Sequence, residues 1–376
     1  MESEAGARTA LWDLTELSQP PSAQWAQKEG SLRSLYYANE PLGGKPTRVF
    51  AYYAVPPKRQ GKVPAMVLVH GGGGKAFPQW AETWAKRGYA ALAMDLAGRG
   101  PDGQRLPDGG PDQEHADKFN AIAKGVRETW PYHMVAAVLR GVSLVAAQPE
   151  VDPVRIGITG ISWGAYLTCI TAGLDTRLKL AIHVYGCGFL HHNSCWLPIL
   201  REMPENDRRL WIETFEPSLY LGQARMPMLW VTGTNDFAYP LDSFQKSSRL
   251  PKGPRMLGVT VGMGHSHEAG CAPAEIGLFA DQHLRGGIPL PDIGPMRIKG
   301  SHVDASFLSR SRVLRGALHY TRDTAAWDQR KWQSQPAEID ERRVRAILPE
   351  GRPLAFFLTI SDIRRATVST EHRELK

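Results

Sequence analysis

The segment Arg155-Ile156-Gly157-Ile158-Thr159-Gly160-Ile161-Ser162-Trp163-Gly164 decides the fold that we expect for this chain. Residues 155–159 form an apolar run that predicts a strand, and a helix-compatible stretch follows at 165–172. Gly-x-Ser-x-Gly between a strand and a helix is typical of a sharp turn that presents a nucleophilic serine. Because the two glycines lack Cβ atoms, the chain can turn tightly and hold Ser162 in a strained conformation with its Oγ exposed.

Apolar strands alternate with helical segments on both sides of this turn. Strands that are apolar throughout are typical of a parallel sheet covered by helices on both faces. We therefore expect an α/β fold with a mostly parallel central sheet, preceded by an antiparallel hairpin. The expected strands are 32–37 and 49–55 for the hairpin and 65–69, 89–94, 155–159, 179–185, 228–232 and 259–261 for the sheet, with helices at 79–87, 132–147 and 165–172.

Two insertions and a change of pattern divide the chain further. Residues 97–117 are rich in Gly, Pro and Asp, which predicts an ordered loop at the mouth of a site, and residues 186–224 predict a small helical cap. Short strand-like runs follow beyond residue 289 and predict a small C-terminal β-sandwich. The expected runs are 313–320, 332–339, 344–348, 354–360 and 366–370.

The expected domains are an N-terminal extension (1–30), a catalytic α/β domain (31–292, with the cap at about 186–224) and a C-terminal β-sandwich domain (293–376). Aromatic residues of the last domain fall within or beside its strand runs. This placement favours a packing or oligomerisation element over a carbohydrate-binding unit, and a homo-oligomer is an open alternative.

The composition argues against several classes of partner. The formal charge of +7 is spread along the chain without a block of Lys and Arg, so we expect no nucleic-acid partner. No apolar run reaches the length of about 18 residues that a membrane span needs, so we expect no membrane partner. The amino terminus is polar and lacks the pattern of a leader peptide. As the sequence stands this predicts a cytoplasmic protein, with an exported form that has lost its leader as the alternative.

The cysteines and histidines do not predict a metal site. The four cysteines lack paired C-x-x-C spacing, so free thiols are favoured over a Cys187–Cys195 disulfide. His191 and His192 lie near these cysteines, but their spacing fits no standard zinc site. We expect neither a metal ion nor a cofactor.

The groups that a nucleophilic serine needs occur in a consistent order. A serine hydroxyl reacts once a base takes its proton, and backbone N–H groups must then stabilise the oxyanion. The glycine run 71–74 follows the strand 65–69, so we assign the oxyanion hole to the N–H groups of Gly72 or Gly73 and of Trp163. Asp236 follows the strand 228–232 and is the expected acid, with Asp242 as the fallback.

Two histidines are candidates for the base. His265 and His267 both follow the last predicted strand of the sheet and precede a helix that opens near Pro273. We prefer His267, because its distance to that helix better matches the usual loop, and keep His265 as the alternative. The candidates for the substrate pocket are His70, Arg99, Tyr185 and Trp196.

With these residues located, the chain resembles the α/β-hydrolase superfamily, in its dienelactone-hydrolase-like and acetyl xylan esterase (cephalosporin C deacetylase) branch. The resemblance spans about residues 30–290. It rests on the segments His70 to Gly74, Asp95 to Gly100 and Gly160 to Gly164, on Asp236 and on the His265/His267 loop. It implies an α/β-hydrolase fold, a Ser-His-Asp triad and ester hydrolysis.

Three features depart from the family pattern. Trp163 stands where the deacetylases carry Gln, and Ala97 to Gly100 reads Ala-Gly-Arg-Gly where they carry Arg-Gly-Gln. The nucleophile is a serine, whereas true dienelactone hydrolases use a cysteine. These differences concern the substrate rather than the ester chemistry.

The expected function is a serine carboxylester hydrolase that acts through an acyl-enzyme on short-chain, small-molecule esters. The resemblance points to acetylated carbohydrates. The alternative is a serine peptidase of the acylaminoacyl-peptidase type, whose catalytic domain shares the turn and the order of the triad.

Overall fold

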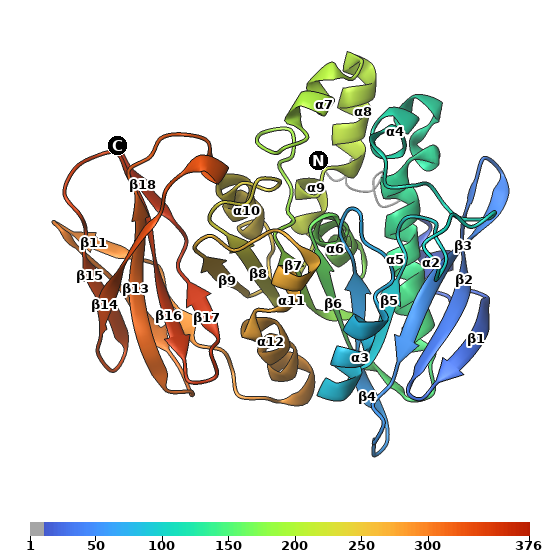
Figure 1. Ribbon diagram of the computed structural model, residues 1–376, viewed down its shortest axis with the longest axis horizontal. Helices are drawn as coiled ribbons and strands as arrows, with labels where there is room; N and C mark the ends of the chain where they lie inside the picture. The colour runs from blue at the N-terminus through green and yellow to red at the C-terminus, as the bar shows by residue number, and fades with distance from the viewer. Residues whose placement is uncertain (1–10) are drawn as a thin grey trace.

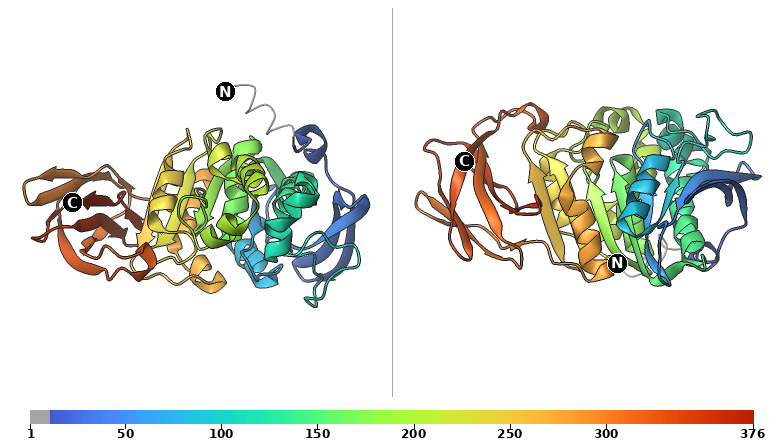
Figure 2. Two further views of the ribbon diagram at one scale, coloured as in Figure 1. Left: turned by 90° about the horizontal axis from the view of Figure 1, so that it is seen from above. Right: turned by 60° about the horizontal axis from the view of Figure 1, so that its bottom comes forward.

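A computed structural model describes residues 11–376, so residues 1–10 of the expected N-terminal extension lie outside the described residues. The molecule is elongated (Figures 1 and 2). The N-terminal strands lie at one end, the helix-covered sheet is in the middle, and the C-terminal strands lie at the other end. The described N-terminal part also contains a short helix, α2 (Leu14–Leu17), and the strand β1 (Ala23–Glu29).

The central sheet is mixed, as the alternation of strands and helices predicts. Its order is β1-β2-β3-β5-β4-β6-β7-β8-β9, and the strands from β5 to β9 pair in parallel. The bounds are β2 (Leu32–Leu42), β3 (Lys45–Ala54), β4 (Val63–Val69), β5 (Ala90–Met94), β6 (Val151–Ile161), β7 (Leu178–Val184), β8 (Met228–Gly233) and β9 (Arg255–Thr260).

Helices cover both faces of this sheet (Figure 1). In β4, Ala65, Val67 and Val69 belong to the core that includes α5 and α6, whereas Met66 and Leu68 belong to the core that includes α3 and α12. Both sets are buried, so each strand stabilises two helical layers at once. The bounds of these helices are α3 (Pro78–Arg87), α5 (Trp130–Ala146), α6 (Trp163–Leu174) and α12 (Ala274–Arg285).

The expected elements of the α/β part are present, and most are longer than predicted. The hairpin strands extend to Leu42 and from Lys45 onward, and the last sheet strand, expected at 259–261, begins at Arg255. The strand β1 was missed because its run Ala-Gln-Trp-Ala-Gln-Lys-Glu alternates only weakly. β1 is stabilised by its antiparallel pairing with β2, and the residue pattern of β1 alone does not reveal this pairing.

Both insertions lie beside the carboxyl ends of the parallel strands. The loop after β5 runs to α4 (His115–Lys118) and the short turns η1 (Asn120–Lys124) and η2 (Val126–Glu128). The segment between β7 and β8 contains α7 (Leu197–Glu202), α8 (Glu205–Phe215) and α9 (Ser218–Leu221). Figure 1 shows α4, α7 and α8 together above the sheet. The remaining helices, α10 (Leu241–Ser248) and α11 (His267–Cys271), follow β8 and β9.

The C-terminal strands pair with one another and with the central sheet. β13 pairs with β14 and β16, while β15 pairs with β12 and β14. β17 also pairs with β9 at Ser369 and Leu257, so β9 has a neighbour on its outer side. The bounds are β10 (Asp292–Ile293), β11 (Arg297–Lys299), β12 (His302–Leu308), β13 (Val313–Thr321), η3 (Trp327–Gln329), β14 (Gln333–Ile339), β15 (Arg343–Ile347), β16 (Leu354–Asp362), β17 (Thr367–Ser369) and β18 (Arg373–Leu375).

None of the helices between residues 11 and 376 combines the length and the apolar character that crossing a bilayer requires.

Candidate active site

Ser162 lies at the turn between β6 and α6 in a strained conformation. Its φ is 56° and its ψ is −120°, a region that residues other than glycine rarely adopt. The flanking glycines make this turn fit, because a Cβ at Gly160 would overlap the backbone of Gly164 and a Cβ at Gly164 would overlap the carbonyl of Val69. The Ser162 N–H donates to the Val184 carbonyl at 2.9 Å, which fixes the turn to the neighbouring strand.

Three side chains from three loops form a chain of hydrogen bonds. His265 Nε2 lies 2.9 Å from Ser162 Oγ, and His265 Nδ1 lies 2.6 Å from Asp236 Oδ2. The other carboxylate oxygen of Asp236 accepts the N–H groups of Ala238 and Tyr239 at 3.0 and 2.7 Å. With the acid on Nδ1, that nitrogen carries the proton, and Nε2 is free to accept the serine hydroxyl proton.

His267, the preferred base at the sequence level, does not contact Ser162, and the geometry corrects that preference in favour of His265. His267 is the first residue of α11, and its ring stacks on Phe77 with centroids 3.7 Å apart. It is one wall of a pocket of about 500 Å³ beside α3. Burial lowers the pKa of His267 to about 4. The preference for His267 was based on its distance to a helix expected near Pro273. The next helix, α11, already begins at His267, so that distance does not identify the base.

Asp242, the fallback acid, also lies elsewhere. It is in the first turn of α10, where its Oδ1 accepts a hydrogen bond from Asn193 Nδ2 at 2.9 Å. Asp236 is therefore the carboxylate next to the histidine.

Tyr185 supports the histidine loop rather than lining a substrate pocket. It is fully buried, its hydroxyl donates to the Ser266 carbonyl, and its ring centroid lies 4.2 Å from that of His265. Burial raises the pKa of Tyr185, so the hydroxyl stays protonated as a donor. Its position corrects the assignment of Tyr185 to the substrate pocket.

The structure separates the two glycines that were alternatives for the oxyanion hole. The Gly73 N–H donates to Gln113 Oε1 at 2.9 Å, so it is already engaged. Gly72 is exposed, and the ring of Trp163 lies against it, with Cδ1 3.1 Å from where a Gly72 Cβ would stand. Trp163 is the first residue of α6, a position whose N–H has no acceptor within the helix. Gly72 and Trp163 are thus the better pair of donors.

His70 connects the glycine turn to the sheet and does not face a pocket. Its Nε2 accepts the Leu96 N–H at 2.9 Å, and its Nδ1 lies 2.7 Å from the Gly71 carbonyl. Burial lowers the pKa of His70 to about 4, so the ring stays neutral and can donate from Nδ1. Because both nitrogens serve the backbone, the assignment of His70 to the substrate pocket is corrected.

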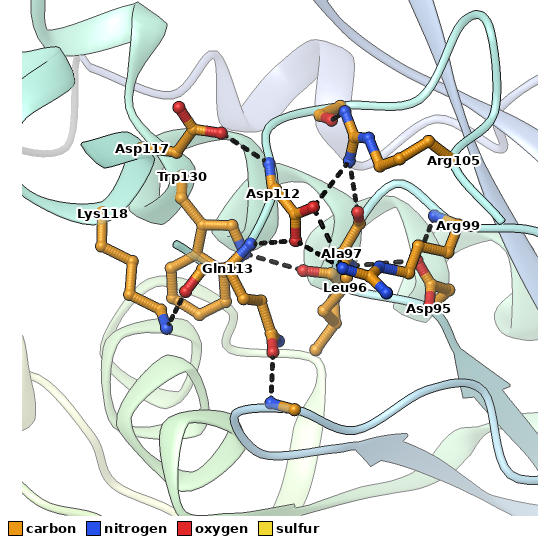
Figure 3. A network of polar contacts seen from close by, with 12 residues as sticks. Asp95, Leu96, Ala97, Arg99, Arg105, Asp112, Gln113, Asp117, Lys118 and Trp130 are labelled. Carbon is orange, nitrogen blue, oxygen red and sulfur yellow. Dashed lines mark hydrogen bonds and ion pairs between the residues drawn. The ribbon is translucent and has the colours of Figure 1, made fainter. Parts of the chain in front are cut away.

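Figure 3 shows how the loop after β5 reaches the glycine turn. The Gln113 side chain makes two hydrogen bonds to the glycine turn. Its Oε1 accepts the Gly73 N–H, and its Nε2 donates to the Gly71 carbonyl at 3.4 Å. The Gln113 N–H donates to Asp112 Oδ1 at 2.6 Å, and Asp112 forms an ion pair with Arg99 at 3.2 Å. Arg99, another candidate for the substrate pocket, has a half-exposed side chain. Its guanidinium pairs with Asp112 and so stabilises this loop.

Lys118 completes this network from α4. Its Nζ donates to the Gln113 carbonyl and lies over the rings of Trp130 and Trp163, 5.3 and 4.8 Å from their centroids. Burial lowers the pKa of Lys118 to about 8. Trp196 packs against the same Trp163 ring with centroids 4.5 Å apart, so it is the pocket candidate that lies beside the turn of Ser162.

The candidate zinc ligands serve other contacts. His191 Nδ1 lies 3.4 Å from Glu216 Oε2, and all four cysteines are free thiols. Within the described chain, residues 11–376, no group of three or more His, Cys, Asp or Glu side chains is arranged to hold a metal ion.

Gln113 is a residue that sequence reasoning missed. The loop 97–117 was expected at the mouth of a site, but its composition contains no signal that marks Gln113 over the other polar side chains. Its contact with Gly73 joins residues 40 positions apart and appears only in the folded chain.

The fold and this site define a protein with the α/β-hydrolase fold. Residues 31–195 match the acetyl xylan esterase family. An acetyl xylan esterase structure from a Paenibacillus species superposes with a TM-score of 0.58 at 23% identity, covering 74% of this chain and 94% of that one. The expected resemblance to acetyl xylan esterases is thus confirmed over residues 31–195.

Two curated relatives are also similar over part of the chain. Acetyl esterase Axe7A of Xylanibacter ruminicola is 25% identical over 142 residues, which is 35% of this chain and 31% of that protein. The uncharacterized peptidase YuxL of Bacillus subtilis is 21% identical over 244 residues, which is 59% of this chain and 35% of that protein. The chain thus spans about a third of the length of these relatives.

Proposed function

We propose that the protein is a serine carboxylester hydrolase that works through an acyl-enzyme. The observation that carries this proposal is the continuous chain from Asp236 through His265 to Ser162, with atom separations of 2.6 and 2.9 Å. A hydroxyl within hydrogen-bond reach of an imidazole, which is itself held by a buried carboxylate, has what nucleophilic catalysis requires.

In the first half of the proposed reaction, Ser162 Oγ forms a bond to the ester carbonyl carbon while its proton passes to His265 Nε2. Asp236 holds the Nδ1–H of the resulting imidazolium. The N–H groups of Gly72 and Trp163 donate to the oxyanion. The imidazolium then returns the proton to the leaving alcohol as the C–O bond breaks.

In the second half, a water molecule attacks the acyl-enzyme. His265 Nε2 takes the proton of this water as the second tetrahedral intermediate forms. When the bond between Ser162 Oγ and the acyl carbon breaks, the imidazolium returns that proton to Oγ, which releases the acid and restores the hydroxyl. The ester and one water molecule are the only reactants, and the side chains and N–H groups named above are restored at the end of the cycle.

We propose short acyl groups, above all acetyl on a carbohydrate, as the substrate class. The similarity to acetyl xylan esterase and acetyl esterase supports this. The indole of Trp163 beside Gly72, with Trp196 packed on it, supports a restricted space next to the nucleophile.

Two measurements on the purified chain test the ester hydrolase. We expect hydrolysis of p-nitrophenyl acetate that falls as the acyl chain lengthens, and release of acetate from acetylated xylan oligosaccharides. A fluorophosphonate should stop the reaction and, with loss of fluoride, add the mass of its phosphonyl group to the peptide that contains Ser162. A labelled, inactivated protein whose adduct lies elsewhere would refute the role of Ser162.

The alternative is a serine peptidase of the acylaminoacyl type, which the similarity to a Bacillus subtilis peptidase favours. Comparison of p-nitrophenyl acetate with an acetylated aminoacyl anilide separates the two. Higher kcat/KM on the anilide would reverse the ranking.

We also propose the domain limits 31–292 and 293–376, with a C-terminal β-sandwich that packs on the catalytic domain. The pairing of β17 with β9 and the buried cluster of Trp327, Phe357 and Val259 support packing as its role. A homo-oligomer remains part of this proposal, and light scattering of the full chain tests it.

A further inference from the structure

One amide joins the C-terminal strands to the loop of the proposed catalytic acid. Asn235 directly precedes Asp236, and its Nδ2 points at three backbone carbonyls around the turn η3. The distances are 2.7 Å to Arg330, 3.0 Å to Asp328 and 3.5 Å to Trp327. The Trp327 carbonyl also accepts the Arg330 N–H at 3.3 Å, so the amide adds to a turn that is already hydrogen-bonded and also reaches the carbonyls of Asp328 and Arg330.

The other end of this amide reaches the histidine loop. Asn235 Oδ1 lies 2.7 Å from Thr234 Oγ1, and the same hydroxyl accepts the Gly262 N–H at 3.1 Å. Because Thr234 Oγ1 accepts from Gly262, its own proton is available for Asn235 Oδ1. Gly262 begins the loop that continues to His265. The acid loop and the base loop are thus tied together and, through one side chain, to residues 327–330.

The turn that receives Asn235 is itself well packed. Trp327 is 6% exposed, and the Arg330 guanidinium lies over its ring, 3.6 Å from the centroid. Trp327 packs in one cluster with Phe357 from the C-terminal strands and with Leu241 and Val259 from the α/β part. Because η3 is already packed on both sides, it loses little further freedom when it accepts hydrogen bonds from Asn235, and it can therefore fix the orientation of the loop that carries Asn235.

We propose that Asn235 is a positioning residue for the triad, through which the C-terminal strands set the orientation of Asp236 and His265. This inference rests on the proposed function of that triad. It goes beyond a packing role for residues 293–376, since it makes a contact with those residues part of the geometry of the active site.

A matched pair of variants tests the proposal in the full chain. Asn235→Ala removes the amide next to the triad. Gln245→Ala removes a comparable amide, which bonds the backbone of His372 at 2.7 and 3.2 Å from α10. We expect Asn235→Ala to lower kcat on p-nitrophenyl acetate roughly 10- to 100-fold, as for small displacements of catalytic groups, with KM changed less than about twofold. Gln245→Ala should keep kcat within about twofold of wild type.

Thr234→Val is a second, nearly isosteric variant in case Asn235→Ala does not fold. It removes the hydroxyl between Asn235 and Gly262 but keeps the volume, so we expect a smaller fall in kcat, on the order of 3- to 10-fold. Equal losses of kcat in Asn235→Ala and Gln245→Ala, or no loss in folded Asn235→Ala or Thr234→Val, would overturn the proposal.

A spectroscopic reading keeps this test apart from the test of the function. The Nδ1–H proton shared by His265 and Asp236 should give a downfield NMR resonance, assigned by its loss in Asp236→Asn. The resonance should broaden or shift in Asn235→Ala and stay unchanged in Gln245→Ala, whatever ester the protein hydrolyses. An unchanged resonance in Asn235→Ala contradicts the positioning role even if the protein is an esterase. If the wild type does not hydrolyse esters but the resonance shifts in Asn235→Ala as expected, only the esterase proposal is contradicted.

Discussion

Ser162 and the pair Asp236–His265 lie in one site, but they are positioned by different means. Ser162 is held by backbone packing, in which Gly160 and Gly164 let the turn lie against the β4 carbonyl at Val69. Asp236 and His265 stand on loops that depend on side chains from elsewhere, namely Tyr185 below the histidine and Asn235 beside the acid.

This difference teaches how each half of the site should respond to change. Backbone packing leaves no room for an added atom, because protein interiors are close-packed and the obstacle is a main-chain carbonyl. Hydrogen bonds from side chains can be lost one at a time, each at a moderate cost. The nucleophile turn should therefore fail abruptly, while the supports of the acid and the base should fail in steps.

The largest effect should separate the two candidate histidines. We expect His265→Ala to lower kcat/KM for p-nitrophenyl acetate roughly 10⁴- to 10⁶-fold, because loss of the base disables a triad as a unit. His267→Ala should retain activity within about tenfold, since its ring packs on Phe77 and not on Ser162. The reverse order of the two losses would restore the original preference for His267.

The next effect concerns the stability of the nucleophile turn. Gly164→Ala should lower the free energy of unfolding by about 3–5 kcal/mol, because the new Cβ meets the Val69 carbonyl and the main chain must shift. Gly222→Ala is the control, since its φ is −64° and no atom lies near the added methyl group. Urea denaturation measures both, and a change below about 1 kcal/mol in Gly164→Ala would contradict the role of backbone packing.

A smaller loss is expected where a side chain supports the oxyanion turn. Gln113→Ala should lower kcat roughly 10- to 50-fold with little change in KM, because Gly73 loses its partner and the N–H of Gly72 loses alignment. Gln282→Ala, which also removes an acceptor of one backbone N–H, that of Leu290, is the matched control. Steady-state kinetics on p-nitrophenyl acetate compares them, and equal kcat values would show that the turn keeps its shape without Gln113.

The last effect concerns the junction between β9 and the C-terminal strands, where Glu275 Oε1 and the Thr367 carbonyl lie beside Gly258 of β9. Burial on α12 raises the pKa of Glu275 to about 7 from 4.5, so the folded chain keeps a proton that the unfolded chain releases. Stability from this group is therefore lost as the pH rises from about 4.5 to 7. The free energy of unfolding of Glu275→Gln, relative to that of wild type, should therefore be about 1–3 kcal/mol higher at pH 8 than at pH 5. Urea denaturation at both pH values tests this, and an equal difference at both would contradict it.

The sequence predicted the α/β part well because its signals are local. Apolar runs gave the strands β4 to β8, and Gly160 to Gly164 gave the turn with Ser162 in a strained conformation. Asp236, three residues beyond the end of β8, lies beside a histidine of the expected loop. Of the C-terminal strands, β13 to β17 were found as segments, whereas β10, β11, β12 and β18 were missed. The pairing of β17 with β9 was also missed, because it joins residues more than a hundred positions apart.

By itself, the sequence determined the alternating strands and helices of the α/β part, the turn that holds Ser162 and the residue types of the proposed triad. Only the tertiary structure decided which histidine meets Ser162, which glycine N–H is free, and that Gln113 and Asn235 support the site. The physical reason is the range of the forces involved. Backbone conformation follows from neighbouring residues, whereas a hydrogen bond between loops depends on how distant segments pack.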